Sequence, residues 1–217
     1  MDNLSEMFIY RIPLMKSNRR MLEIATNDLP KSNVKGEFSP GLYFCSLALK
    51  KDFNFYVKEF DFVKNGKPVL NSGKFGLSVS YTDDCIYVAI TKNGVIGIDA
   101  EQISDIELKV AGEFMSKNEL IKMDGVKNKI EYLYMLWTLK EAYLKLTGEG
   151  VNDKIKSIEF LKDKNGEFSL YLDSHQKTYF NNFIFKNYSI SIASYTSLYY
   201  KIIDFETTKE FLEKYED

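Results

Sequence analysis

The sequence predicts an α+β fold in which mainly antiparallel sheets pack against helices. Residues 75–82 and 85–91 have the composition of strands and flank the pair Asp83-Asp84, which is typical of a hairpin. Residues 128–148 carry apolar side chains all around the helical axis, which favours a helix packed on several faces. After Gly150, short β-prone segments follow one another with turns between them. This order is typical of antiparallel pairing.

Composition places the chain among globular proteins. Its 217 residues are 45% hydrophobic and 15% aromatic, which is enough for one large domain or two small ones. A net charge of −2 implies no general affinity for nucleic acid or anionic membranes. No segment reaches the roughly 18 apolar residues of a membrane span, and the first residues lack a signal peptide's pattern. Cys45 and Cys85 have no metal-binding or CxxC spacing, so we expect a protein of a reducing compartment, the cytoplasm.

The segment before residue 70 predicts two strands, two helices and a turn. Pro40 suits the first position of the second helix, and Leu42, Cys45 and Leu49 contribute to its apolar face. The predicted elements are a strand at 7–12, helices at 17–29 and 41–51, a strand at 55–63, a turn at Asn65-Gly66 and an extended path at Lys67-Pro68.

The strand predicted at 95–101 carries two acids. Side chains two apart in a strand point to the same face, so Asp99 and Glu101 project together while Ile98 and Ala100 face the core. A divalent cation removes the repulsion between neighbouring carboxylates, and Mg²⁺ is commonly held by one or two of them together with substrate phosphates. The acids therefore indicate a magnesium site, although acids at strand ends are also common without one.

Two helical segments follow this strand. Residues 107–123 predict a helix that breaks and restarts at Ser116, where Ser116 and Glu119 have capping-box spacing. Asn128 and Glu131 have the same spacing at the start of the long helix, and Gly148 suits the left-handed residue at its end.

The long helix carries Lys140, Glu141 and Lys145 within two turns. Glu141 and Lys145 are spaced i, i+4, which alone fits an ordinary surface ion pair. Charges on a mostly buried helix instead require partners. With Glu141 as a third metal ligand beside Asp99 and Glu101, and Lys145 as a counter-charge for phosphate, the pattern favours metal-assisted phosphoryl chemistry.

The rest of the chain predicts strands and a closing helix. His175 is the only histidine and stands in a polar turn, so we expect a surface residue and neither Ser-His-Asp nor zinc chemistry. The predicted elements are strands at 155–160, 167–172, 179–185, 188–194 and 198–203, a turn at 163–166 and a helix at 207–215.

Three linked motifs carry a family resemblance. Residues 97–101 read Gly-Ile-Asp-Ala-Glu, residues 114–119 read Phe-Met-Ser-Lys-Asn-Glu, and residues 137–145 read Trp-Thr-Leu-Lys-Glu-Ala-Tyr-Leu-Lys. Their order and spacing resemble the signature of the 4'-phosphopantetheinyl transferases of the surfactin-synthetase type. The segments 66–68 and 77–82 are similar to two further motifs of that family, so the resemblance covers about residues 66–150.

The resemblance implies transfer of 4'-phosphopantetheine from coenzyme A to a serine of an apo acyl- or peptidyl-carrier protein, with release of 3',5'-ADP. It implies Mg²⁺, or Mn²⁺ in its place, on Asp99, Glu101 and Glu141. Glu141 is the candidate base, with Glu119 as the alternative, and Lys145 would stabilise the leaving phosphate.

The resemblance also implies a coenzyme A site at Lys67, Pro68, Ser80, Tyr81 and Lys145. The family usually has histidine at the position of Tyr81. A tyrosine hydroxyl donates a hydrogen bond but cannot become cationic, so we expect weaker binding of coenzyme A. Tyr81 also fits an ordinary strand aromatic.

For the fold, the resemblance implies two similar α+β halves, residues 1–96 on the coenzyme A side and 97–217 on the metal and carrier side, with the active site at their junction. We expect a monomer. Two other functions fit parts of the pattern: a different Mg²⁺-dependent enzyme acting on a nucleotide or pyrophosphate, and a non-catalytic protein that binds coenzyme A or a carrier.

Overall fold

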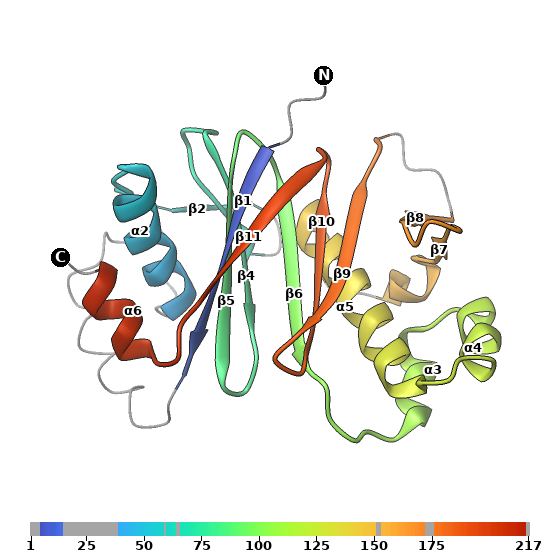
Figure 1. The fold of residues 1–217 in the computed structure, drawn as a ribbon. Coiled ribbons are helices and arrows are strands. Elements are labelled where there is room, and N and C mark those ends of the chain that lie inside the picture. The colour runs from blue at the N-terminus through green and yellow to red at the C-terminus, as the bar shows by residue number, and fades with distance from the viewer. Residues whose placement is uncertain are drawn as a thin grey trace.

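Two sheets lie face to face, and each carries helices on its outer side. The computed structural model describes residues 5–14, 39–58, 60–63, 66–150, 153–171 and 176–215. Helices α2 and α6 cover one sheet, while α5, with α3 and α4 beside it, lies on the outer side of the other (Figure 1). The predicted α+β class with two similar halves is confirmed.

The first sheet has four strands in the order β11-β1-β5-β4. β1 pairs antiparallel with β5 and parallel with β11, so the sheet is mixed where the sequence predicts antiparallel pairing. The strands are β1 (Ser5–Pro13), β4 (Phe75–Tyr81), β5 (Cys85–Lys92) and β11 (Leu198–Asp204).

The second sheet has five antiparallel strands in the order β6-β10-β9-β8-β7. A separate two-stranded ribbon pairs β2 (Asp61–Phe62) with β3 (Pro68–Val69). The strands of the second sheet are β6 (Ile96–Gln102), β7 (Phe160–Lys162), β8 (Phe168–Leu170), β9 (Tyr179–Phe185) and β10 (Tyr188–Ser194).

Local sequence explains where the helices begin and end. Ser116 and Glu119 form the complete predicted capping box, and Asn128 accepts a hydrogen bond from the amide of Glu131. Gly148 is left-handed with φ 73°, which ends the long helix as predicted. The helices are α2 (Pro40–Phe53), α3 (Ala111–Phe114), α4 (Lys117–Asp124), α5 (Lys129–Thr147) and α6 (Thr208–Tyr215), with short 3₁₀ helices η4 (Leu108–Val110) and η5 (Asp153–Ser157).

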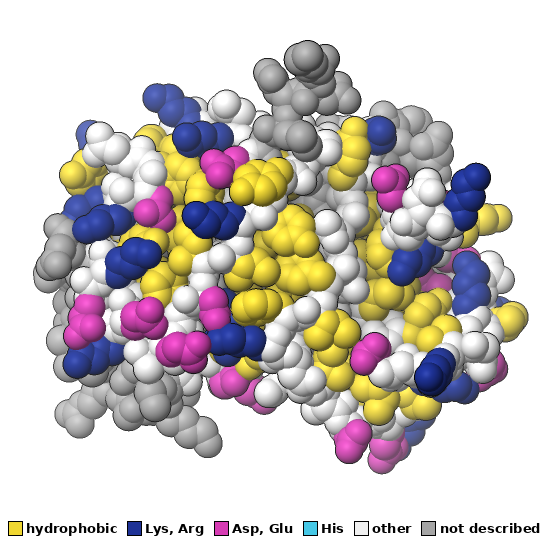
Figure 2. All heavy atoms as spheres, viewed as in Figure 1, with side chains coloured by type: hydrophobic (Ala, Val, Ile, Leu, Met, Phe, Trp, Pro, Cys, Tyr) yellow, Lys and Arg dark blue, Asp and Glu magenta, His cyan; other side chains and the backbone are white. Residues whose placement is uncertain are grey.

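The three largest apolar clusters among the described residues hold these layers together. One lies between α2, α6 and the first sheet, a second is shared by the facing sides of both sheets, and the third joins α5 to α3, η5 and β7. Figure 2 shows hydrophobic side chains along the middle of one face, over the strands of the two sheets. The shared cluster includes Ile98 and Ala100, which confirms the predicted inward face of β6.

Two predicted strands are wrong. At 55–63 only Asp61–Phe62 forms a strand, because Asn54 turns left-handed after α2 and Phe55 bonds back to the carbonyl of Leu49. At 155–160 the chain forms η5 before β7 begins, and the carbonyl of Ile155 accepts a hydrogen bond from Lys140. In both places, a hydrogen bond with a nearby helix takes the place of hydrogen-bonded pairing between strands.

The path of the last strand and helix explains another difference between the predicted and the observed halves. β11 and α6 belong with the first sheet, although the sequence assigns residues 97–217 to the second half, because β11 lies against β1. The division into 1–96 and 97–217 as domains stays a prediction. The helix predicted at 17–29, Asn65 and His175 lie outside the described residues. In the described ranges, no helix is both long and apolar enough to cross a bilayer.

Candidate functional site

A close approach between β6 and α5 builds the site. A β-carbon added to Gly97 would lie 2.0 Å from the carbonyl oxygen of Ala142 and 2.6 Å from the amide of Leu146. Only glycine therefore lets the strand lie this close to the helix. The contact brings the acids of β6 next to the turn of α5 that carries Glu141 and Lys145.

Serine side chains join the two sheets at this point. Ser78 Oγ accepts a hydrogen bond from the amide of Ile98 at 3.0 Å, and Ser80 Oγ accepts one from the amide of Ala100 at 3.2 Å. β4 and β6 thus lie side by side through hydroxyl groups, although they belong to different sheets. Ser80 was predicted from the sequence and Ser78 was not, although the period-2 spacing of the two serines indicates that they share a face.

Ser80, Asp99 and Lys145 form a triangle of short contacts. Lys145 Nζ lies 2.8 Å from Asp99 Oδ1 and 3.1 Å from Ser80 Oγ, and Ser80 Oγ lies 2.8 Å from the same carboxylate oxygen. The Asp99 side chain is 6% exposed and that of Lys145 is 30% exposed. Asp99 Oδ2 is buried and has no hydrogen-bond partner in the part of the chain that the structure describes.

Glu141 and Glu101 complete the acidic cluster. Burial, together with the charges of Asp99 and Glu101, raises the pKa of Glu141 to about 7 despite the opposing effect of Lys145. Burial and Asp99 also raise the pKa of Glu101, whose Oε1 accepts a hydrogen bond from Trp137 Nε1 at 3.2 Å. Among the described residues, Glu141 Oε1 is buried without a hydrogen-bond partner. The cluster therefore has carboxylate oxygens that protein donors do not use.

A cavity of about 400 Å³ opens beside this cluster. Lys67 and Pro68 come to it from the first half of the chain, and Glu141 and Lys145 come from α5. Lys67 Nζ donates to the carbonyls of Ile96 and Leu146, and burial lowers its pKa to about 8. With Tyr81, the cavity thus brings together five of the residues predicted to serve in ligand binding and catalysis.

Tyr81 lies at the wall of the same cavity and contacts the start of α2. Its hydroxyl accepts a hydrogen bond from the amide of Gly41 at 3.0 Å and forms another with Ser39. A β-carbon on Gly41 would lie 2.6 Å from that hydroxyl oxygen. Tyr81 thus satisfies a backbone donor in the first turn of α2, a role that the sequence analysis missed along with Ser39.

Glu119 makes its contacts elsewhere. Its Oε2 pairs with Lys140 Nζ at 2.7 Å and accepts from the amide of Ser116 at 2.9 Å, while Oε1 accepts from the amide of Phe160 at 3.3 Å. The side chains of Glu119 and Lys140 are both 0% exposed. The capping role expected from the sequence is thus present, and the same carboxylate holds a buried lysine of α5.

The residues at the acidic cluster fit a hard divalent cation by their chemistry. Asp99 Oδ2 and Glu141 Oε1 are oxygen donors without partners, and Mg²⁺ prefers such carboxylate ligands. Across the described ranges, no three acidic, cysteine or histidine side chains converge closely enough to coordinate an ion as they lie. In this arrangement Lys145 lies against Asp99, and rotation of these side chains would bring the unpartnered oxygens closer together.

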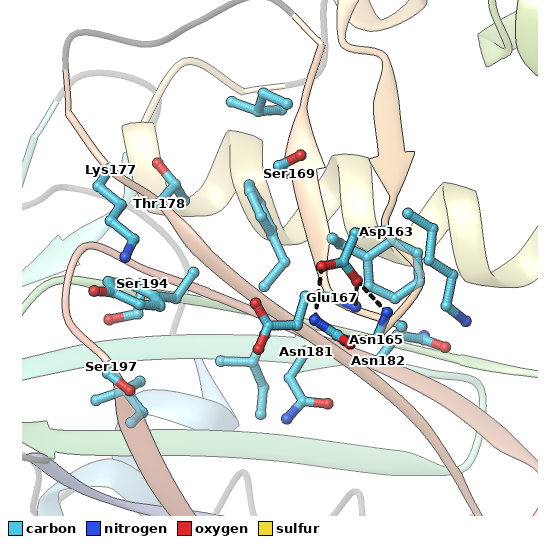
Figure 3. A pocket seen from close by; sticks show the side chains of 18 of the residues that line it. Asp163, Asn165, Glu167, Ser169, Lys177, Thr178, Asn181, Asn182, Ser194 and Ser197 are labelled. Atoms are coloured by element: carbon cyan, nitrogen blue, oxygen red, sulfur yellow. Dashed lines mark hydrogen bonds between the residues drawn. The ribbon is translucent and has the colours of Figure 1, made fainter.

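A larger cavity of about 790 Å³ lies away from the acidic cluster, along β8, β9 and the turn between β10 and β11. Figure 3 shows Asp163 bonded to Asn165 and to the amide of Glu167, with Asn181 nearby. Its lining combines both signs of charge with amides and hydroxyls, and it includes none of the predicted site residues. We therefore place the candidate site at the smaller cavity, where chemistry and burial coincide.

Comparison with known proteins gives a consistent family. The model of the 4'-phosphopantetheinyl transferase superfamily matches residues 95–193. The chain is 31% identical over 120 residues to the 4'-phosphopantetheinyl transferase psf-1 of Bacillus pumilus, covering 54% of this chain and 51% of that protein. It is 34% identical over 108 residues to the holo-(acyl-carrier-protein) synthase of Oenococcus oeni, covering 45% of this chain and 79% of that protein.

Among solved structures, the chain is similar to a holo-(acyl-carrier-protein) synthase from Bacillus anthracis in complex with CoA (3',5'-ADP). The two share 23% identity with a TM-score of 0.39, over 46% of this chain and 92% of that one. Matches to curated relatives such as the Bacillus pumilus transferase span about half of their length, 51% in that case.

Proposed function

Since the chain belongs to the 4'-phosphopantetheinyl transferase superfamily, we propose that it transfers 4'-phosphopantetheine from coenzyme A to a serine of an apo acyl- or peptidyl-carrier protein and releases 3',5'-ADP. The observation that carries the proposal is the cavity of about 400 Å³ beside the acidic cluster. It unites Lys67, Pro68 and Tyr81 with Glu141 and Lys145, beside a buried Asp99. Lysine ammonium groups and spare carboxylate oxygens at one cavity suit a pyrophosphate and its counter-ion.

Coenzyme A would lie along this cavity with its pyrophosphate near Lys145. Lys145 is partly exposed there, so its ammonium can contact a bound phosphate. Lys67, Pro68, Ser80 and Tyr81 remain the proposed coenzyme A residues. Ser80 is 2% exposed and bonds to Asp99, which supports an indirect role for it, through the orientation of the acid and of Lys145.

Asp99, Glu101 and Glu141 would hold Mg²⁺, or Mn²⁺ in its place. The unpartnered oxygens Asp99 Oδ2 and Glu141 Oε1 support this set. The bound ion would neutralise negative charge on the pyrophosphate oxygens.

The chain's own residues supply the proton transfer and the orientation. The carrier serine Oγ forms a bond to the phosphorus next to pantetheine, while the bond from that phosphorus to the bridging oxygen of the 3',5'-ADP group breaks. Glu141 is the candidate base for the serine proton: its pKa is about 7 in the protein alone, and a metal ion on the same carboxylate would lower that pKa and weaken it as a base. Lys145 stabilises the negative charge on the leaving phosphate. Glu119 is the alternative base, but its buried pair with Lys140 supports a structural role instead.

We further propose that the protein acts as a monomer in the cytoplasm, without nucleic acid or membrane. A single chain supplies both walls of the cavity, which supports a site that needs no second copy. Size-exclusion chromatography with light scattering would test the oligomeric state.

The decisive experiment is intact-protein mass spectrometry of an apo carrier after incubation with this protein, coenzyme A and Mg²⁺, beside a sample with EDTA. We expect a mass gain of one phosphopantetheine on the carrier serine that is absent with EDTA. Release of 3',5'-ADP without any acceptor would instead indicate a pyrophosphate hydrolase. Coenzyme A binding without transfer to any acyl or peptidyl carrier would indicate the non-catalytic protein.

A further inference from the structure

Lys145 lies against Asp99, one of the acids that would hold the metal ion. Its ammonium and the hydroxyl of Ser80 both contact Asp99 Oδ1, and the lysine and serine also contact each other. These contacts occupy one side of the carboxylate, while Oδ2 has no partner. In this arrangement the protein's own ammonium is the counter-charge of the acid.

The other lysine of the cavity cannot take this role without breaking existing bonds. Lys67 Nζ donates to the backbone carbonyls of Ile96 and Leu146, and its contacts within the described ranges include no carboxylate. Glu101 lies two residues after Asp99 on the same strand, and Glu141 lines the same cavity as Lys145. Of these two lysines of the cavity, Lys145 is therefore the one paired with an acid of the cluster.

The two partners in the Lys145–Asp99 pair differ in their freedom to move. Asp99 is on a buried strand and is fixed by Ser80, whereas Lys145 is in the last turn of α5 and its side chain is 30% exposed towards the cavity. A lysine side chain is a flexible four-carbon stem with a compact charge. The ammonium can thus move into the cavity while the acid stays in place.

We infer that Lys145 is a resident counter-cation that a divalent metal ion displaces. It neutralises Asp99 in the metal-free protein and moves towards the pyrophosphate of coenzyme A when the ion binds. The second half of this inference rests on the proposed function, because it takes coenzyme A as the ligand. A divalent ion repels an ammonium twice as strongly as another ammonium would at the same distance, so the two cannot share one carboxylate at low cost, even on different oxygens.

This exchange makes the metal and the anionic ligand mutually dependent. Without coenzyme A, an ammonium displaced by a metal ion loses its contact with Asp99 and gains no phosphate. With coenzyme A in the cavity, the displaced ammonium gains a phosphate. Each ligand should therefore tighten the binding of the other by the same factor.

The test measures Mn²⁺ binding by electron paramagnetic resonance of the free ion, without coenzyme A or carrier protein, at pH 7. We expect Lys145→Met to bind Mn²⁺ at least tenfold more tightly than the natural protein. Lys67→Met is the matched control, because it removes a charge from the same cavity but frees no carboxylate, and we expect a change below threefold. Circular dichroism checks the fold of each variant, and Lys145→Gln repeats the test with a polar side chain.

Adding coenzyme A provides the second measurement. It should tighten Mn²⁺ binding at least tenfold in the natural protein and much less in Lys145→Met. Equal Mn²⁺ affinity of Lys145→Met and the natural protein, or an equal gain in Lys67→Met, would overturn the exchange. Transfer to a carrier without these changes in Mn²⁺ affinity would overturn the exchange but keep the proposed function. The changes in affinity without transfer would keep the exchange but overturn the proposed function.

Discussion

Two lysines of α5 each pair with a carboxylate, yet the two pairs differ in every respect that matters for ligand binding. Lys140 and Glu119 are both 0% exposed, and Lys140 also donates to the carbonyls of Phe114 and Ile155. Lys145 is 30% exposed, and its partner Asp99 keeps one buried oxygen without a hydrogen bond. The two lysines are five residues apart in one helix.

The two pairs differ in saturation, that is, in whether every polar atom of the pair has a hydrogen-bond partner within the protein. In the Lys140–Glu119 pair, the ammonium and both carboxylate oxygens have protein partners, so the pair fixes α4, α5 and η5 relative to one another. In the Lys145–Asp99 pair, spare oxygens and nearby acids leave capacity for a ligand. A buried polar group without a partner destabilises a fold, and such groups concentrate at functional sites.

The largest expected effect is on transfer by the unsaturated cluster. Glu141→Ala should lower the transfer rate roughly a thousandfold, since it removes a proposed metal ligand and base. Its free energy of unfolding should not fall, because the lost carboxylate is buried without a bond at Oε1 and is repelled by its neighbours. Carrier labelling followed by mass spectrometry gives the rate, and urea unfolding gives the stability. Glu131→Ala, at the exposed start of α5, is the control, and full activity of Glu141→Ala would refute the assignment.

The saturated pair should show the opposite behaviour. Lys140→Met leaves the Glu119 carboxylate buried without its counter-charge, which should lower the free energy of unfolding by about 3–5 kcal/mol. Urea unfolding measures this loss, and transfer per folded molecule should remain. The double variant Lys140→Met with Glu119→Gln should recover part of the stability, because it removes the unpaired charge. If Lys140→Met had normal stability but no transfer activity, Lys140 would belong to the active site, and the two lysine pairs would not differ in role.

The pH dependence of stability sharpens the comparison further. Because the pKa of Glu141 is raised to about 7 in the folded protein, its protonated form favours the folded state at low pH. Without metal, that contribution is lost as pH rises from about 4.5 to 7, on the order of 3 kcal/mol. Urea unfolding in EDTA should show this fall for the natural protein and a flatter profile for Glu141→Gln. Parallel profiles for the two proteins would contradict the raised pKa.

The smallest expected effect concerns Tyr81, whose hydroxyl has partners although its side chain lines the cavity. Tyr81→Phe removes the acceptor for the amide of Gly41 and the partner of Ser39. The free energy of unfolding should therefore fall by about 1 kcal/mol. Thermal unfolding measures the change, with Tyr56→Phe at an exposed position as the control. A stability equal to that of the natural protein would show that the start of α2 does not depend on this contact.

Local spacing predicted much of this molecule. The capping box at Ser116, the ends of α5 and the hairpin of β4 and β5 follow from patterns of a few residues, and the structure confirms them. The prediction that Asp99 and Glu101 point to the same face of β6 likewise follows from the two-residue repeat of a strand. These features depend on neighbours in sequence, which is why sequence reasoning finds them.

Contacts between distant segments could not be predicted in this way. The sequence places Lys140 and Lys145 within two turns of one helix without indicating a partner for Lys140, and only the packing of α4 against α5 makes Lys140 buried and fully paired. The joining of β4 to β6 through serines depends on two sheets that meet at their edges. The parallel pair of β1 and β11 brings together residues nearly two hundred positions apart, as Arg11 and Asp204 show.

That last pair has a consequence for how the protein is made. β1 lies between β5 and β11, so it cannot bury both of its edges until β11 has left the ribosome. During synthesis, one edge of β1 is open to pairing with other chains. Pairing over such a sequence separation is slow, so folding of the first sheet should follow completion of the chain. Any shortening that removes β11 would leave this edge open for good, and aggregation would be its first symptom.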